Sequence, residues 1–110
     1  MPLPCAASYV WWREWRGAAN RPRRVNSTGV FHGCKHALAQ MVAQPLDAHG
    51  RRGYVVNVAS MLGYVGLSRG AGAYCASKGA VLNLTRAVAL DYAKERIHVN
   101  ALCPGCELDR

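Results

Sequence analysis

Residues 73–94 read AYCASKGAVLNLTRAVALDYAK and have the pattern of one long helix. The apolar side chains recur on a single helical stripe, at Val81, Leu84, Val88 and Tyr92. Short β-branched runs flank this helix, YVVNV at 54–58 and IHVNAL at 97–102, and both are predicted as strands, the first of them buried. Two strands joined through so long a helix are expected to be parallel, as neighbours or near neighbours with a right-handed crossover.

A second helix is predicted upstream, from residue 25 to Pro45. It rests on apolar residues at helical spacing, namely Val30, Phe31, Cys34, Leu38, Met41 and Val42. A polar side chain could cap its start, at Asn26, Ser27 or Thr28. Polar or glycine-rich stretches at 47–53 and 59–72 are predicted as loops. The order helix, strand, helix, strand predicts half of an open α/β sheet.

Residues 1–24 differ from the rest of the chain in composition. They hold three tryptophans, five arginines and one acidic residue, and no helical or strand period runs through them. These 24 residues carry half of the net charge of +8. The other half is spread over the rest of the chain, which is an ordinary charge balance for that length. We expect 1–24 to be a disordered segment unrelated to the fold, and 25–110 to form a single domain. The alternatives are a basic, aromatic arm for nucleic acid or an anionic surface, and a transit peptide.

The chain is predicted to be a soluble, cytoplasmic protein. No run approaches the roughly eighteen apolar residues that a membrane-spanning helix needs. The five cysteines form no even disulfide framework, and the first residues lack a secretory pattern, so the thiols are expected to be reduced. No metal site is expected, because the four histidines are scattered and a second C-x-x-C is lacking. His32 and His36 lie four residues apart on a predicted helix and could share a metal, but ordinary, partly exposed side chains are expected there.

Tyr74 and Lys78 lie four residues apart near the start of the later helix, so they share one face about a turn apart. An ammonium beside a phenol favours the phenolate form, which suits the phenol to acid and base chemistry. Ser60, on the loop before this helix, could donate a hydrogen bond to a reacting oxygen. Together the three residues suggest proton transfer to or from an alcohol or a carbonyl.

From residue 25 to residue 105 the chain resembles the short-chain dehydrogenase/reductase family. Four pieces carry the resemblance, VNSTGVF at 25–31, NVAS at 57–60, the Tyr-x-x-x-Lys motif at 74–78 and VNALCPG at 99–105. Each piece is weak alone, but their common order, with a helix and a strand where expected, makes the match specific. The resemblance implies a partial Rossmann-like, doubly wound parallel sheet that is truncated at both ends.

The resemblance also implies an oxidoreductase that uses NAD or NADP to interconvert an alcohol and a ketone or aldehyde. Tyr74 would exchange a proton with the substrate oxygen, and Lys78 would hydrogen-bond the nicotinamide ribose and promote ionisation of the phenol. Ser60 would orient the substrate oxygen, and Asn26 would hold a water in a proton relay. The residues implied to contact the cofactor are Tyr74, Lys78, Pro104 and Gly105.

Each implied catalytic residue has a purely structural alternative. Asn26 could only cap a helix, and Ser60 could bond its own loop backbone. Tyr74 and Lys78 could be an exposed pair with no role. The occurrence of all four together favours the catalytic interpretation. Structural hydrogen bonds alone are expected from two strand residues, Asn57 and Asn100.

Parts of the family pattern are missing from this sequence. It holds no G-x-G-x-x-G turn for a pyrophosphate, and only five residues follow Pro104-Gly105. We therefore expect a fragment with little or no activity alone. Neither the substrate nor the choice between NAD and NADP follows from the residues present.

Other functions stay open beside the enzymatic one. The helix at 74–94 could pair with a second subunit and form a homo-oligomer, or make the chain a non-catalytic interaction protein. Cys103 and Cys106 form a C-x-x-C that could carry thiol redox chemistry, although no helix follows that would acidify the thiol. Nucleic-acid binding ranks last, because it rests on residues 1–24 alone.

Overall fold

The structure is a computed structural model that describes residues 20–67 and 70–105 of the chain. One continuous helical rod opens the described part, built from α2, a π-helical segment η1 and α3. A strand, a short 3-10 helix, a second long helix and a second strand follow. The bounds are Asn20–Pro22 for α2, Arg23–Thr28 for η1, Gly29–Ala43 for α3, Gly53–Val58 for β1, Met61–Gly63 for η2, Gly72–Asp91 for α4 and Ile97–Leu102 for β2.

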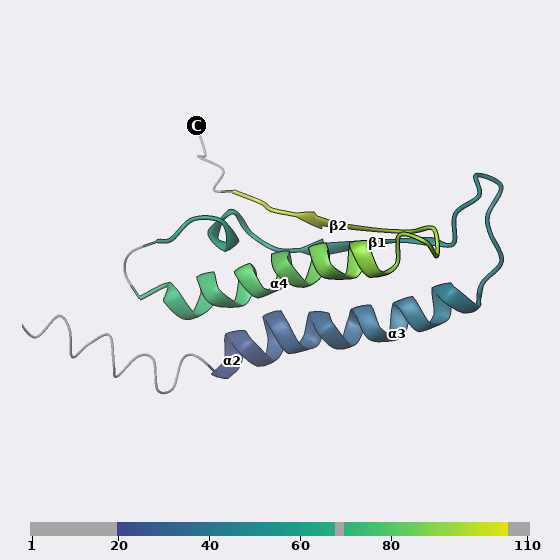
Figure 1. Cartoon of the computed structure of the whole chain (residues 1–110). Coiled ribbons are helices and arrows are strands. Elements are labelled where there is room, and N and C mark those ends of the chain that lie inside the picture. The colour runs from purple at the N-terminus through teal and green to yellow at the C-terminus, as the bar shows by residue number, and fades with distance from the viewer. Residues whose placement is uncertain (1–19, 68–69, 106–110) are drawn as a thin grey trace, which may run out of the picture.

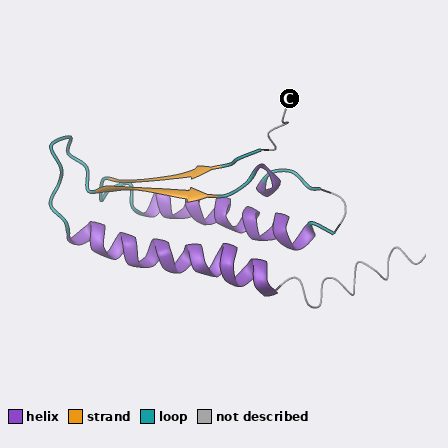
Figure 2. Ribbon diagram, turned by 180° about the vertical axis from the view of Figure 1, so that it is seen from behind, coloured by secondary structure: helices purple, strands orange, loops and turns teal. Residues whose placement is uncertain are grey.

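The two strands form a parallel sheet, as the sequence predicts. Their register runs from Gly53 opposite Ile97 to Val58 opposite Leu102. Both α3 and α4 lie on the same side of this sheet, and the other face carries no helix of the described residues (Figure 1; the view from behind in Figure 2 agrees). The predicted α/β class and the helix–strand–helix–strand order are confirmed.

The core lies between the sheet and the two helices. One group of buried apolar residues joins α3 to β2, and a second joins α4 to the end of β1. The first comprises Cys34, Leu38, Ile97 and Val99, and the second comprises Ala59, Val81 and Leu82. Full burial of a valine, leucine or isoleucine side chain contributes about 1.5–3 kcal/mol, so the aliphatic members of both groups stabilise the packing of the helices on the sheet.

A network of buried side-chain hydrogen bonds crosses the same core. Asn57 donates from Nδ2 to Thr85 Oγ1 at 2.9 Å, and Thr85 donates to the Val81 carbonyl at 2.7 Å. The thiol of Cys34 donates to Asn57 Oδ1 at 3.5 Å. The predicted structural role of Asn57 is therefore confirmed, because its amide ties β1 to both helices. Asn100 is exposed on β2 and makes no side-chain hydrogen bond within the described residues, so that expectation is wrong there.

The first helix starts earlier than the sequence predicts. The chain is already helical at Asn20, and Pro22 fits this first stretch because a first-turn residue needs no N–H partner. The predicted caps are wrong, since Asn26, Ser27 and Thr28 lie inside the rod and Thr28 makes no capping bond. Residues 20–24, assigned to the disordered segment, are helical, and the rest of that segment lies outside the described residues.

Strand β1 is half exposed, which corrects the prediction of a fully buried strand. Its side chains alternate between the helix side and the open side of the sheet. The exposed apolar residues of that open face are Tyr54, Val56, Val58 and, on β2, Leu102. The β-branched composition is typical of parallel strands covered on both faces, and the described part of the chain covers only one face.

The connections differ from prediction in detail. Helix α4 ends at Asp91 rather than at Lys94, because the chain must turn back toward β2, and Arg96 takes a left-handed φ of 57° in that turn. The loop after α3 is held by Asp47, whose carboxylate accepts the N–H groups of Arg51 and His49 at 2.8 Å each. These donors, that of Arg51 first, lower the pKa of Asp47 below its ordinary value. None of the described helices is both long and apolar enough to cross a membrane.

Candidate active site

Lys78 connects the first turns of α4 to the end of β1. Its Nζ donates to the Val58 carbonyl at 2.9 Å, and the same Nζ lies 5.9 Å from the centre of the Tyr74 ring. Tyr74 is 38% exposed on the first turn of α4. The ammonium is thus held beside the phenol ring by a main-chain carbonyl rather than left free in solvent.

Ser60 lies two residues beyond that carbonyl, where the chain leaves β1. Its backbone is extended, it caps η2, and Oγ accepts the N–H of Leu62 at 3.2 Å. Only 8% of Ser60 is exposed. Among the described residues the hydroxyl hydrogen has no protein acceptor, so the group can still donate. The structural alternative for Ser60, a bond to its own loop, therefore describes its acceptor side and leaves its donor side free.

The short helix η2 fixes the position of Ser60 relative to α4. A Cβ added to Gly63 would lie 2.7 Å from Leu82 Cδ1 and 2.8 Å from the Lys78 carbonyl oxygen, so η2 lies tightly against α4. On its other side, the N–H of Met61 donates to the Pro104 carbonyl at 3.0 Å. Main-chain contacts thus place η2, the short helix that Ser60 caps, between the Lys78 turn of α4 and the turn after β2.

Pro104 and Gly105 lie beyond the end of β2, at the same edge of the sheet as Ser60. The ladder continues past the strands through the N–H of Ala59, which donates to the Leu102 carbonyl at 2.8 Å. A Cβ on Gly105 would approach Met61 Sδ at 3.3 Å. The carboxyl ends of parallel strands are where open α/β sheets bind ligands, and these residues gather there.

Asn26 reaches the same region from the first helix. It lies in the π-helical segment η1, and its Nδ2 donates to Ser77 Oγ at 3.1 Å. Ser77 in turn donates to the Tyr74 carbonyl at 2.7 Å. Single π-helical turns inside α-helices occur frequently at functional sites, and this one coincides with the predicted catalytic asparagine.

The predicted catalytic residues of η1 and α4 are therefore linked by short contacts, and Ser60 lies two residues beyond the carbonyl that Lys78 binds. Ser77 is the member that the sequence interpretation missed. A signal for it exists, because Ser77, Val81 and Thr85 follow each other at a spacing of four and all three are buried. A hydroxyl on a buried helical stripe requires a partner, and Asn26 is that partner.

The residues proposed for other chemistry are not brought together in the same way. Cys103 is a free cysteine packed at the edge of the second core group, and Cys106 lies outside the described residues. His32 and His36 are exposed on α3. Across 20–67 and 70–105, no group of three or more metal-ligating side chains gathers.

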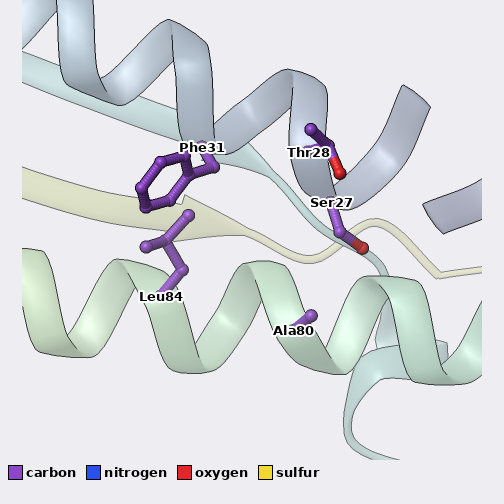
Figure 3. A pocket seen from close by; sticks show the side chains of 5 residues that line it. All are labelled: Ser27, Thr28, Phe31, Ala80 and Leu84. Carbon is purple, nitrogen blue, oxygen red and sulfur yellow. The ribbon is translucent and has the colours of Figure 1, made fainter. Parts of the chain in front are cut away.

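A shallow groove of about 280 Å³ lies between the first helix and α4, and none of the predicted catalytic residues lines it. Its lining residues are Ser27, Thr28, Phe31, Ala80 and Leu84. Figure 3 shows Phe31 and Leu84 facing one another across it. The lining is mostly apolar, so the groove is suited to a protein side chain rather than to a polar substrate.

The residues present fit the reactive end of a nicotinamide cofactor. A lysine ammonium held beside a phenol, a buried serine hydroxyl and a Pro-Gly turn lie together at the carboxyl ends of parallel strands. A pyrophosphate cradle is absent from the sequence. The fold and the site thus define an α/β protein of the Rossmann type with a Tyr-x-x-x-Lys site.

The family assignment follows from comparison with known proteins. A family model described as "short chain dehydrogenase" matches residues 17–107, and the chain belongs to that family. The resemblance seen in the sequence is confirmed. The match begins inside the arginine- and tryptophan-rich segment.

Individual relatives and solved structures agree with this assignment. The chain is 48% identical over 88 residues to 2-(S)-hydroxypropyl-CoM dehydrogenase 3 of Xanthobacter autotrophicus. This match covers 80% of this chain and 32% of that protein. The crystal structure of 3-hydroxyacyl-CoA dehydrogenase type-2 from Mycobacterium avium matches with a TM-score of 0.77 and 32% identity, over 82% of this chain and 35% of that one. The Pseudomonas aeruginosa RhlG/NADP active-site complex matches with a TM-score of 0.68 and 28% identity, over 89% and 37%. This chain thus spans about a third of the length of each relative.

Proposed function

We propose that this chain carries the catalytic residues of an NAD(P)-dependent oxidoreductase that interconverts an alcohol and a ketone or aldehyde. One observation supports this above the others. The Lys78 ammonium is bound to the Val58 carbonyl at the end of β1 and lies 5.9 Å from the centre of the Tyr74 ring, and the buried Ser60 follows Val58 by two residues. An isolated exposed pair would not need a lysine anchored to a strand carbonyl beside a buried serine.

In the proposed reduction, Tyr74 gives its phenolic proton to the substrate oxygen as that oxygen gains negative charge. The neighbouring Lys78 ammonium stabilises the resulting phenolate. The free donor side of Ser60 hydrogen-bonds the substrate oxygen and orients it. Asn26 holds a water in the proton relay. In the oxidation direction, Tyr74 takes the alcohol proton back.

The cofactor proposed is NAD or NADP. The bound nicotinamide supplies hydride transfer to or from the substrate carbon. Lys78 and Tyr74 would contact the ribose side, and Pro104 and Gly105 would form the surface under the ring. The solved relative that carries NADP supports a nicotinamide cofactor, and no described residue of this chain selects between the two forms.

We further propose that the chain alone has little activity and works in the cytoplasm. Nothing in the sequence resembles a glycine-rich pyrophosphate turn, so most of the binding energy of a dinucleotide has no source in these residues. A homo-oligomer could form through α4, where the groove lined by Phe31 and Leu84 offers an apolar contact. A non-catalytic interaction protein is the alternative function, and the exposed apolar face of the sheet favours it.

A chimera tests the catalytic proposal. Residues 25–105 of this chain would replace the matching third of 2-(S)-hydroxypropyl-CoM dehydrogenase 3, which supplies the rest of a complete enzyme. We expect the chimera to oxidise 2-(S)-hydroxypropyl-CoM, and Tyr74→Phe to lower kcat about 10²–10⁴-fold, because it removes the general acid/base. Steady-state kinetics with NAD or NADP would measure this.

Tyr92→Phe is the matched control, because Tyr92 lies at the far end of α4. This substitution is expected to leave kcat unchanged. Equal rates in the Tyr74→Phe and Tyr92→Phe chimeras would contradict the proposal. So would a saturable rate of the 110-residue chain alone that survives Tyr74→Phe.

A further inference from the structure

Ser77 lies at the junction of the first helix and the first turn of α4, and it is 5% exposed. Its Oγ accepts from Asn26 Nδ2 at 3.1 Å and donates to the Tyr74 carbonyl at 2.7 Å. Its own carbonyl accepts from Ser27 Oγ at 3.2 Å. Two consecutive residues of η1 therefore hold both the side chain and the main chain of one residue on α4.

The same arrangement occurs a second time on α4, two turns later. Thr85 accepts from the amide of Asn57 at 2.9 Å and donates to the Val81 carbonyl at 2.7 Å. Thr85 is 4% exposed, so the two hydroxyls are equally buried. The first pair ties α4 to the π segment η1, and the second ties it to β1. Only the first pair acts on the turn that carries Tyr74.

We propose that Ser77 is a positioning residue that sets Tyr74 against Lys78 by tying the first turn of α4 to the π segment. A serine that bonds the carbonyl three or four residues back alters its own helical turn. Here that carbonyl belongs to Tyr74, so the bond fixes the backbone from which the phenol projects. This inference rests on the proposed function, in which the placement of Tyr74 matters.

The contact also explains why the π segment holds Asn26 in its observed place. A π turn winds more widely than an α turn and changes the direction of the side chains that it carries. The Asn26 amide is thereby aimed at a hydroxyl on the neighbouring helix. Without that hydroxyl, a half-buried amide would lose its acceptor, and the η1–α4 junction would loosen.

The test uses the full 110-residue chain, labelled with ¹⁵N and ¹³C, without substrate or cofactor. The Tyr74 ring signals are assigned by Tyr74→Phe. We expect Ser77→Ala to shift the Tyr74 ring signals, weaken their NOEs to Lys78, and speed amide exchange in the first turn of α4 about tenfold. Ser77→Thr is expected to restore all three, because Thr85 shows that a threonine can make the same pair of bonds.

Thr85→Ala is the matched control, since it removes the equivalent hydroxyl from the other end of the helix. It is expected to lower stability by a similar factor and leave the Tyr74 signals in place. A purely structural role for Ser77 predicts the same Tyr74 response in both alanine variants, and that result would overturn the proposal. If Ser77→Ala unfolds the chain, Ser27→Ala removes only the contact to the Ser77 carbonyl and is expected to shift the Tyr74 signals in the same direction by less. Unchanged signals in Ser27→Ala would then overturn it.

These spectra do not depend on catalysis. An inactive chimera with the expected NMR shifts would reject the oxidoreductase proposal and leave the coupling between Ser77 and Tyr74 intact. If the chimera is active, Ser77→Ala is expected to lower its kcat and to leave its KM unchanged. An active chimera whose kinetics ignore Ser77→Ala would reject the positioning role alone.

Discussion

Gly63 sets how closely the 3-10 helix η2 can lie against α4. Any side chain at this position would meet the Lys78 carbonyl oxygen, a main-chain atom inside a helix that cannot move without breaking the turn. The same main chain carries Lys78, whose Nζ reaches the end of β1. The absence of one Cβ therefore permits η2, the short helix that Ser60 caps, to pack against the turn of α4 that carries Lys78.

Gly63→Ala is expected to push η2 away from α4 and to destabilise the fold by about 1–3 kcal/mol, the usual cost of overpacking. Denaturant unfolding followed by circular dichroism would measure the loss. Gly66→Ala is the control, because a Cβ at Gly66 meets nothing within 4 Å. If both alanine variants unfold at the same denaturant concentration, the close packing of η2 does not contribute to stability.

At the scale of single residues, spacing was enough to predict that Lys78 lies beside Tyr74, and the 5.9 Å from its Nζ to the centre of the Tyr74 ring confirms this. The catalytic roles of Tyr74, Lys78 and Ser60 stay predictions. Spacing failed for the contacts of Asn26, because a polar residue near an expected helix start looks like a cap. The described helix already includes Asn20, which lies in the segment 1–24 where the sequence shows no period. The bond from Asn26 to Ser77 joins residues 51 positions apart, and no local pattern encodes such a contact.

At the scale of elements, Arg52 links the two helix–strand connections. Its Nη1 donates to the carbonyls of Val42 and Gln44 at the end of α3, at 3.1 and 2.6 Å, and its Nε lies 3.8 Å from a Glu95 carboxylate oxygen. Its own N–H donates to the Arg96 carbonyl at 3.0 Å. A cation here also interacts favourably with the negative end of the helix dipole.

Arg52→Ala is expected to lower the free energy of unfolding by about 1.5–3 kcal/mol, because carbonyls at a helix end lose a charged donor. Thermal or urea unfolding would measure this. Arg51→Ala is the control, since Arg51 is exposed and its side-chain partner is the exposed hydroxyl of Tyr54. A loss in Arg51→Ala as large as that in Arg52→Ala would show that the helix-end contact is not the cause.

The type and order of the elements could be read from the sequence, and the bounds of β2 agree with the prediction. The π segment could not be predicted, because it depends on how the first helix packs against α4 and not on local propensity. The exposure of β1 could not be predicted either. A β-branched run specifies a strand, but whether a second layer covers it is decided outside that run.

At the scale of the whole molecule, the described residues cover only one face of the parallel sheet (Figure 1 and Figure 2). Parallel sheets in known proteins are almost always buried on both faces. Here Val56 is 62% exposed at the centre of β1, with Tyr54 and Val58 beside it on the same face. Within the described residues, neither outer edge of the two-stranded sheet is paired. An apolar face bounded by unpaired edges is expected to associate with a second copy of itself.

Val56→Lys is accordingly expected to shift the chain toward monomer, because each copy would place an ammonium in the apolar contact. Sedimentation velocity over a range of concentrations would measure the distribution. Leu46→Lys adds the same charge at an exposed apolar residue of the loop after α3, so it controls for charge and is expected to sediment like the parent chain. If Phe31→Lys disperses the assembly and Val56→Lys does not, copies meet through the helix groove instead. In that case the open face of the sheet stays exposed to solvent in the assembly, and its apolar side chains are no evidence for a partner at this face.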